Sequence, residues 1–511
     1  MKRFANLEVE WVNRHQRTLL VFLSFVVPLA VRAVPEILMG QFLVGYDGMA
    51  YYVPYTTLWL KGLQPYGLSS GAGIWNLIGL APLLYGILLG IGYAGFPLVI
   101  SLKVVSPLLL GFLGLAVYFY ANKSLAWSSK KCFLVSVVST VYFVSLRISW
   151  DLLRTELSLI FLFLAMAFLT REKLSFRNAV LLSLAMFLVV FSDQLVALIM
   201  FAIVLINIMK LSFSKQLAGA RKIIICSVPS VASFCLIIYA AFQVSQISLV
   251  NGRLSQGTSG LSTVFGFTSV VNSALNTAGF VAFCYVPLLP FLLLSFTRFR
   301  NNLQVKTWIL FIFAAVLVSI VIPNNLVGAS PYRWVLLLTY PLAFVVVDVL
   351  STFKSKQSKI SGAAILLLVL VLFSSSFIAL PNEHPLSYFS FYPNYFPTSM
   401  LQNTLSLNNC QNAVKALQWV KSNMSDNSVL LTSEAFWGFA SLTLNPNQYL
   451  FYGYGNVTQF AEKVAASSPT YSIYMIWWVN GTGWYGQTSV PSIFHQLHQN
   501  GDIVIYSYHP T

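Results

Sequence analysis

The chain has 511 residues, of which 57% are hydrophobic and only 9% are charged, and its formal net charge is +16. Soluble domains carry about 25% charged residues, so this composition excludes an ordinary soluble enzyme and predicts an integral membrane protein. The positive charge does not indicate a nucleic-acid partner, because the cytoplasmic loops of membrane proteins are enriched in Lys and Arg.

Apolar runs long enough to cross a hydrocarbon core of roughly 30 Å recur along the first part of the chain. We predict about eleven spans of this kind. They are expected at 18–34, 98–120, 132–148, 150–170, 178–192, 194–210, 223–245, 279–297, 307–323, 333–350 and 361–380. The segment 74–93 is also apolar, but it contains Pro82 and several glycines. We expect a broken, re-entrant or juxtamembrane helix there.

Basic residues cluster in alternate connections between the predicted spans. They lie before the first span and near 123–131, 171–177, 210–222, 298–306 and 354–359. The positive-inside rule assigns these loops and the N-terminus to the cytoplasmic side of a multi-pass protein of the cell membrane. A further span at 74–93 would place all later basic clusters on the outer side. We therefore do not count that segment as a membrane span.

The composition changes near residue 380, where long apolar runs give way to Asn, Gln, Ser and Thr. We predict a transmembrane module at 1–380, an interfacial linker at 381–409 and a small α/β domain at 410–511, which the span count places on the extracytoplasmic side. In this domain we expect helices and strands to alternate. The helices are expected at 410–423, 457–466 and 490–499, and the strands at 428–433, 448–452, 471–478 and 502–508.

Five of the fourteen carboxylates fall at or near the predicted outer membrane face. These are Glu36, Asp47, Asp151, Glu156 and Asp193. Ionisable groups at membrane depth are costly and usually functional. Asp47 is the strongest candidate, because flanking Gly45 and Gly48 leave room for a substrate or ion and neighbouring aromatic residues, including Tyr51 and Tyr52, suit sugar rings. The alternative is a turn residue in an interfacial aromatic belt.

Charged residues near three later spans form the rest of the candidate site. Asp151 and Arg154 are three residues apart, so one helix face presents both, while Glu156 lies on another face. An ordinary helix N-terminus accounts for Asp151, because a negative charge there is favoured by the helix dipole. It does not account for Arg154, whose positive charge opposes that dipole. Arg333 precedes a late span, where a guanidinium suits a phosphate at the membrane surface or anchors the helix at the interface. Asp193 is either functional or a helix N-cap.

The available ligands restrict any metal site. No His lies in the predicted spans, so a zinc or iron site within the membrane is not expected. Carboxylates suit Mg²⁺ or Mn²⁺, and Asp47 and Asp151 are the ligands that we assign to such a cation. Arg32 and Lys61 are interpreted as membrane anchors.

The motifs GYDGMAYY, RISWDLLRTELSL and SPYRWVLLLTYPLA contain Asp47, Asp151 and Arg333. Together they resemble the acidic outer loops and the late arginine of the GT-C superfamily of polyprenyl-phosphate-dependent glycosyltransferases. The resemblance implies inverting transfer of a sugar from a polyprenyl (dolichyl) phosphate to an acceptor that it does not identify. It implies Asp47, Asp151 and Glu156 as catalytic residues. It implies substrate or phosphate contacts for Arg154, Arg333, Asp193, Tyr51 and Tyr52, although many members have His where Asp193 stands.

Three alternatives remain beside this interpretation. A transporter or flippase would also have many spans, but the sequence has no internal repeat and its candidate charges collect at one face. A non-catalytic scaffold would leave these charges unexplained. The motif WWVNG at 477–481 is similar to a signature of oligosaccharyltransferases, but Val479 stands where those enzymes have an acid.

Overall fold

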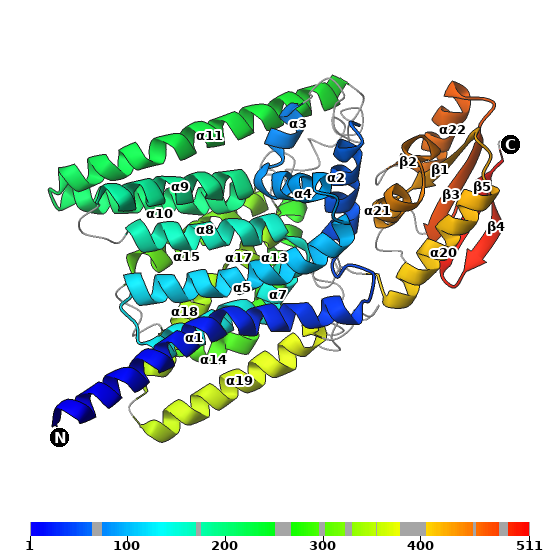
Figure 1. Ribbon diagram of the computed structural model, residues 1–511. Coiled ribbons are helices and arrows are strands. Elements are labelled where there is room, and N and C mark those ends of the chain that lie inside the picture. The colour runs from blue at the N-terminus through cyan, green and yellow to red at the C-terminus, as the bar shows by residue number, and fades with distance from the viewer. Residues whose placement is uncertain are drawn as a thin grey trace.

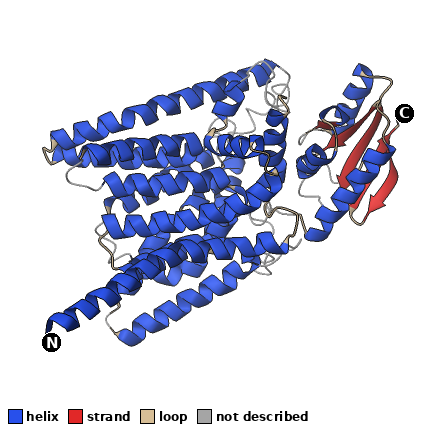
Figure 2. Ribbon diagram, in the orientation of Figure 1, coloured by secondary structure: helices blue, strands red, loops and turns tan. Residues whose placement is uncertain are grey.

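The computed structural model describes residues 2–63, 74–169, 175–250, 267–295, 302–321, 330–353, 355–378, 405–452, 456–479 and 489–509. Figure 1 shows a bundle of long helices with a smaller domain, which contains strands, at one end of it. We call the end of the bundle that faces this domain the domain end, and the opposite end, where the N-terminus lies, the far end. Figure 2 shows that the strands are confined to the smaller domain.

The bundle consists almost entirely of α-helices. They are α1 (Lys2–Leu38), α2 (Val53–Leu60), α3 (Ile74–Gly79), α4 (Leu83–Tyr93), α5 (Leu98–Ser124), α6 (Ser129–Val141), α7 (Phe143–Asp151), α8 (Leu153–Leu169), α9 (Phe176–Ser192), α10 (Gln194–Phe213), α11 (Leu217–Val250), α13 (Phe267–Tyr285), α14 (Leu289–Ser295), α15 (Leu303–Val321), α17 (Pro331–Leu337), α18 (Thr339–Thr352) and α19 (Lys356–Ile378). Two short elements of other types belong to the same series. The π-helix η1 (Gly48–Tyr52) precedes α2, and the 3₁₀ turn η5 (Val286–Leu288) precedes α14. Within the described ranges, eight helices are long and apolar enough to cross a membrane, or nine if one bent pair counts as a span. The chain is therefore a multi-pass membrane protein, and each predicted span falls on a helix or helix pair of this series.

The apolar segment 74–93 forms two short helices rather than one span. α3 and α4 are separated at Leu80–Pro82, where Ala81 has a positive φ of 58° and Pro82 caps α4. The 11 residues of α4 extend about 16 Å, roughly half of a hydrocarbon core. The predicted break is confirmed. Near the domain end, α4 packs against α2 and α3 packs against α11 (Figure 1).

The chain between 129 and 169 has more breaks than the sequence indicated. We predicted two continuous spans at 132–148 and 150–170, but three helices are present. α6 and α7 are bent by 59° at Tyr142, whose backbone is extended, and a second break at Leu152 separates α7 from α8. The short helix α7 therefore ends at Asp151, directly before this second break.

The far end of the bundle contains several of the predicted basic clusters. The N-terminus and the connections α5–α6 and α10–α11 lie there (Figure 1). These connections carry Lys123, Lys130, Lys131, Lys210 and Lys215. These basic segments therefore share one end of the bundle, opposite the smaller domain.

The smaller domain is a mixed sheet with helices. Its elements are α20 (Leu407–Asn423), β1 (Ser428–Thr432), α21 (Glu434–Thr443), the 3₁₀ turn η8 (Pro446–Gln448), β2 (Tyr449–Phe451), α22 (Val457–Ser467), β3 (Ser472–Trp478), β4 (Phe494–Asn500) and β5 (Ile503–Tyr508). The strand order is β2-β1-β3-β5-β4, with parallel pairing around β1 and antiparallel pairing around β5. Trp477 and Trp478 of the WWVNG motif lie in β3 and are buried.

Two elements of this domain differ from the sequence-based expectation. The predicted helix 490–499 is wrong, because β4 pairs with β5 as a hairpin across Gly501, which has a φ of 55°. The Asn500–Gly501 pair is a strong hairpin signal that outweighs the three-residue spacing of His495 and His498. Helix α21 was not predicted, and it is the element of the domain that contacts η1 and α2.

Candidate active site

Asp47 lies at the domain end, in the loop that joins α1 to η1. The side chain is half-buried, and among the described residues no hydrogen bond or ion pair engages its carboxylate. Its backbone amide instead donates to Oδ1 of Asp151, over 3.2 Å. The loop is therefore held by its main chain, and the Asp47 carboxylate is available to a ligand.

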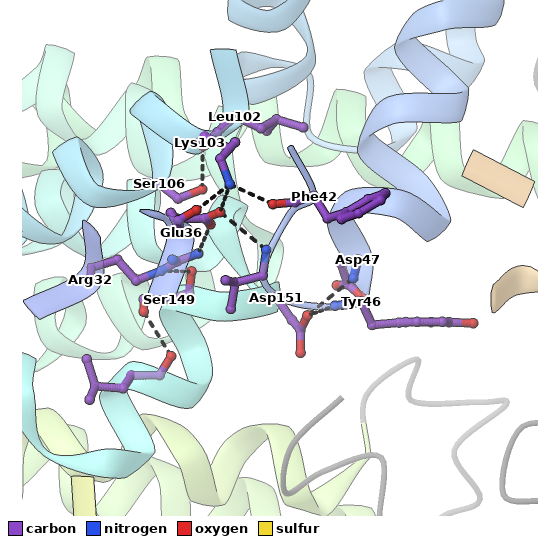
Figure 3. Close-up of polar contacts among 12 residues, drawn as sticks. Arg32, Glu36, Phe42, Tyr46, Asp47, Leu102, Lys103, Ser106, Ser149 and Asp151 are labelled. Atoms are coloured by element: carbon purple, nitrogen blue, oxygen red, sulfur yellow. Dashed lines mark hydrogen bonds and ion pairs between the residues drawn. The ribbon is translucent and has the colours of Figure 1, made fainter. Parts of the chain in front are cut away.

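The side chain of Asp151 binds the backbone of this loop. Its Oδ1 accepts the backbone amides of both Tyr46 and Asp47 (Figure 3). Its Oδ2 pairs with Arg147, one turn earlier on α7. Asp151 is 1% exposed and Arg147 is 6% exposed. The carboxylate therefore joins the loop backbone to α7 through charge-assisted contacts. The sequence placed Asp151 near the site correctly, but the partner Arg147 was missing from our candidate residues.

Position 45 requires a glycine because the backbone packs closely there, and not because a substrate needs room. Its φ is 92°, a conformation that favours glycine. A Cβ atom there would lie far inside contact distance of the Trp150 carbonyl oxygen and would also crowd the Asp151 carboxylate. We expected Gly45 to leave room for a substrate beside Asp47, but this space is filled by the α7–α8 junction.

The charge on Asp47 depends on several neighbours from distant parts of the chain. Burial and the negative charge of Asp151 raise the pKa of Asp47 above its usual range, while Arg333, Arg147 and Arg154 act in the opposite direction. These arginines come from α17, α7 and α8, so the fold brings the predicted Asp47, Asp151, Arg154 and Arg333 into one electrostatic neighbourhood.

The two predicted arginines differ in their contacts. Arg154 on α8 is half-buried and donates from Nη1 to the carbonyl of Leu80, at the break between α3 and α4. Arg333 lies in the first turn of α17, where Ser330 caps the helix. Its half-buried guanidinium makes no hydrogen bond or ion pair with any residue in the described part of the chain. Arg333 is therefore the cation of this group that is available to an anionic ligand.

The two predicted tyrosines have partners within the protein. The Tyr52 hydroxyl donates to the Asp151 backbone carbonyl over 3.1 Å. The Tyr51 hydroxyl donates to Oε1 of Glu434 over 2.8 Å, and the Tyr46 hydroxyl donates to Oε2 of the same carboxylate over 2.7 Å. The tyrosines around Asp47 thus connect the loop to the end of α7 and to the smaller domain.

Glu434 is the first residue of α21, and no pattern in the sequence predicts that it lies near Asp47. Behind it, Gly438 contacts η1 so closely that a Cβ atom would overlap the Met49 backbone. Trp437, from the same helix, packs edge-on against Tyr55 with ring centroids 5.4 Å apart. The smaller domain therefore positions the Asp47 loop directly, through one carboxylate and one close helix contact.

Replacing Glu434 by Ala is expected to loosen the loop without unfolding either part of the protein. Each buried hydroxyl left without its acceptor costs about 1–3 kcal/mol. Hydrogen–deuterium exchange of a peptide covering 42–52 should become faster in this variant. The matched control is Glu462→Ala, an exposed acid on α22 of the same domain, which should leave exchange unchanged. Equal exchange in wild type and Glu434→Ala would contradict a positioning role.

A second buried charge cluster lies beside this loop and corrects one expectation. Arg32 is 1% exposed and pairs with Glu36 over 2.8 Å, so its interpretation as a membrane anchor is wrong. Its Nε also donates to the Ser149 carbonyl on α7 (Figure 3). Lys103 pairs with Glu36 over 3.3 Å and donates to the Phe42 carbonyl over 2.6 Å. These contacts fix the end of α1 against α5 and α7.

Asp193 and Glu156 have different surroundings from Asp47. Asp193 caps α10 by accepting the amides of Leu195 and Val196, and its other oxygen accepts the Thr155 hydroxyl over 2.7 Å. The N-cap interpretation is confirmed. Glu156 is fully buried on α8, and neither of its oxygens has a hydrogen-bond partner among the described residues.

The donor set at Asp47 and Asp151 does not fit the predicted divalent cation. Both oxygens of Asp151 are already bound by amides and by Arg147, which leaves one free carboxylate for a metal. Mg²⁺ and Mn²⁺ sites are usually built from several oxygen ligands. In the described part of the chain, no group of three or more His, Cys, Asp or Glu residues is arranged to hold a metal ion.

Solved structures of low sequence identity share this fold, whereas neither a protein-family model nor a curated protein matches the sequence. ArnT from Cupriavidus metallidurans, bound to undecaprenyl phosphate, has a TM-score of 0.51 and 11% identity over 98% of both chains. The oligosaccharyltransferase of Archaeoglobus fulgidus, tethered to an acceptor peptide with an NVT sequon, has a TM-score of 0.52 and 10% identity over 92% of this chain and 70% of that one. At these identities the likeness concerns the fold, and the chain has the predicted GT-C-like fold.

Proposed function

We propose that this chain is a membrane glycosyltransferase that transfers a sugar from a polyprenyl-phosphate carrier to an acceptor at the outer membrane face. The observation that carries the proposal is that Asp47 and Arg333 lie within electrostatic reach of each other at the domain end of a GT-C-like fold. Neither the carboxylate nor the guanidinium has a hydrogen-bond or ion-pair partner among the described residues. The similar structure of ArnT was obtained with undecaprenyl phosphate, which is a lipid-linked phosphate of the proposed class.

In the proposed reaction, the Asp47 carboxylate accepts the proton of an acceptor hydroxyl as a general base. The acceptor oxygen then forms a bond to the anomeric carbon, while the bond from that carbon to the phosphate oxygen breaks. The electron pair leaves with the phosphate, whose developing charge Arg333 stabilises. Attack and departure on opposite faces of one carbon invert its configuration.

The neighbouring residues support this chemistry by holding Asp47 in place. Asp151 and Arg147 bind the loop from α7, while Glu434 binds its tyrosines from the smaller domain. Burial near Asp151 raises the pKa of Asp47, which makes its carboxylate a stronger base than a solvated aspartate. Arg154 lies within electrostatic reach but is already bound to the Leu80 carbonyl, so we assign it a supporting role.

The test of the proposed function begins with glycan analysis of cells that lack the gene. We expect the loss of one sugar or the accumulation of a truncated glycan, which would also identify the acceptor. Unchanged glycans, in a strain without a second copy of this activity, would favour the transporter or scaffold alternatives.

Arg333→Gln is expected to reproduce the glycan defect in part. Loss of a charge-assisted contact to phosphate should lower transfer about tenfold or more, mainly by weakening donor binding. Lys61→Gln, which removes an exposed cation after α2, is the matched control and should transfer normally. If both variants, at equal membrane abundance, behave as wild type, Arg333 does not bind the donor phosphate.

A further inference from the structure

A groove of about 410 Å³ opens on the surface of the bundle near its far end, between α1, α5 and α8. Its walls are mostly apolar and comprise Val21, Phe112, Leu115, Ala116, Phe119, Ile160 and Leu164. Phe112 is 47% exposed, so the groove faces the surroundings of the bundle rather than its interior. At membrane depth these surroundings are lipid tails, and the volume suits one acyl chain rather than a whole lipid.

The mouth of this groove is positively charged. Arg17 of α1 and Lys123 of α5 line it, and both side chains are exposed. The Arg17 guanidinium donates from Nη2 to Oδ1 of Asn122 over 3.3 Å, which holds it at the mouth and leaves its other N–H groups available. Among the described residues that line the groove there is no carboxylate.

A buried hydroxyl lies along the same groove. Tyr118 on α5 lines it and is 4% exposed, yet its hydroxyl has no hydrogen-bond partner among the described residues. A buried polar group left unsatisfied costs about 1–3 kcal/mol, so such groups usually have a partner in the complete system. The ester carbonyl of a lipid is an acceptor that this apolar groove would bring to it.

We propose that this groove binds one anionic phospholipid of the membrane leaflet at the far end. One acyl chain occupies the apolar part, and the phosphate contacts Arg17 and Lys123. The Tyr118 hydroxyl donates to an ester oxygen between them. Basic sites between membrane helices on the cytoplasmic side recognise anionic head groups, and the predicted topology places the far end on that side. The lipid would join α1 to α5 at the end opposite the candidate active site.

The proposal is tested on the full-length chain in detergent by native mass spectrometry with defined lipids. Dioleoylphosphatidylglycerol should bind as one retained copy, about twenty-fivefold more tightly than dioleoylphosphatidylcholine, if each cation contributes roughly fivefold. The double variant Arg17→Gln/Lys123→Gln should lose this preference. The matched control, Lys210→Gln/Arg221→Gln, removes one Lys and one Arg from the α10–α11 region of the same end and should keep it.

Two further variants test the groove itself without changing charge. Leu115→Trp fills the apolar part and should weaken retention of both lipids. Tyr118→Phe should weaken retention of phosphatidylglycerol about fivefold while leaving thermal stability without added lipid equal or higher, because it removes an unsatisfied hydroxyl. Equal binding of the two lipids to wild type would overturn the proposal. So would a control variant that loses the preference as fully as Arg17→Gln/Lys123→Gln, because the attraction would then be general to the basic surface.

Discussion

Asp47→Asn is expected to lower sugar transfer by roughly 10²–10⁴-fold, the range for loss of a positioned general base. The same variant should fold normally, because the Asp47 backbone amide, and not its side chain, holds the loop to Asp151. Burial and Asp151 both disfavour a negative charge at this position. The neutral variant should therefore unfold at the same temperature as wild type or slightly higher.

Lower transfer together with unchanged thermal stability would distinguish a general base from an aspartate that only stabilises the fold. Glycan analysis of a deletion strain carrying Asp47→Asn gives the activity, while thermal unfolding of the purified variant gives the stability. A variant with normal transfer would remove Asp47 from the mechanism even if deletion of the gene changes the glycans. A variant that loses both transfer and stability would indicate a structural role instead.

Asp151→Ala should have the largest effect on stability. It removes the carboxylate that pairs with the buried Arg147 guanidinium and accepts two loop amides. Removing one member of a buried ion pair typically costs about 3–5 kcal/mol. Thermal unfolding in detergent should show a large decrease, and transfer should be lost because the Asp47 loop is no longer held.

A double-mutant cycle tests the origin of this effect. Replacing both residues, in Arg147→Met/Asp151→Ala, removes the cation together with its carboxylate and should recover much of the stability lost in Asp151→Ala. Transfer should stay low in the double variant, because the loop amides still lack their acceptor. Additive losses from Arg147→Met and Asp151→Ala would mean that the pair does not act as a unit.

The sequence predicted the architecture well because hydrophobic length and charge carry that information locally. The spans, the break at Pro82 and most elements of the smaller domain follow from apolar runs and alternation. The sequence-based predictions are wrong where contacts between distant segments determine the local secondary structure. The extended backbone at Tyr142 and the break at Leu152 interrupt runs that are apolar throughout, and β4 follows its pairing with β5 rather than its own helical spacing.

The candidate site was predictable only in part, for a similar reason. Rare charged residues in an apolar chain identified Asp47, Asp151 and Arg333 as unusual. Which of them have partners and which are free depends on contacts between distant segments. Arg147 could have been found from its four-residue spacing to Asp151, which puts both on one helix face. Glu434 could not, because it lies 388 residues from Tyr46 in an element that was not predicted.

That separation sets an order of events during biosynthesis. The loop at Asp47 is among the first segments to reach the membrane, whereas Glu434 and Gly438 are made after the last membrane helix. The candidate site is therefore incompletely supported until the smaller domain has been made and has docked on η1. Chains truncated before residue 434 should insert and accumulate yet transfer no sugar, so premature termination would yield inert membrane protein rather than a partly active enzyme.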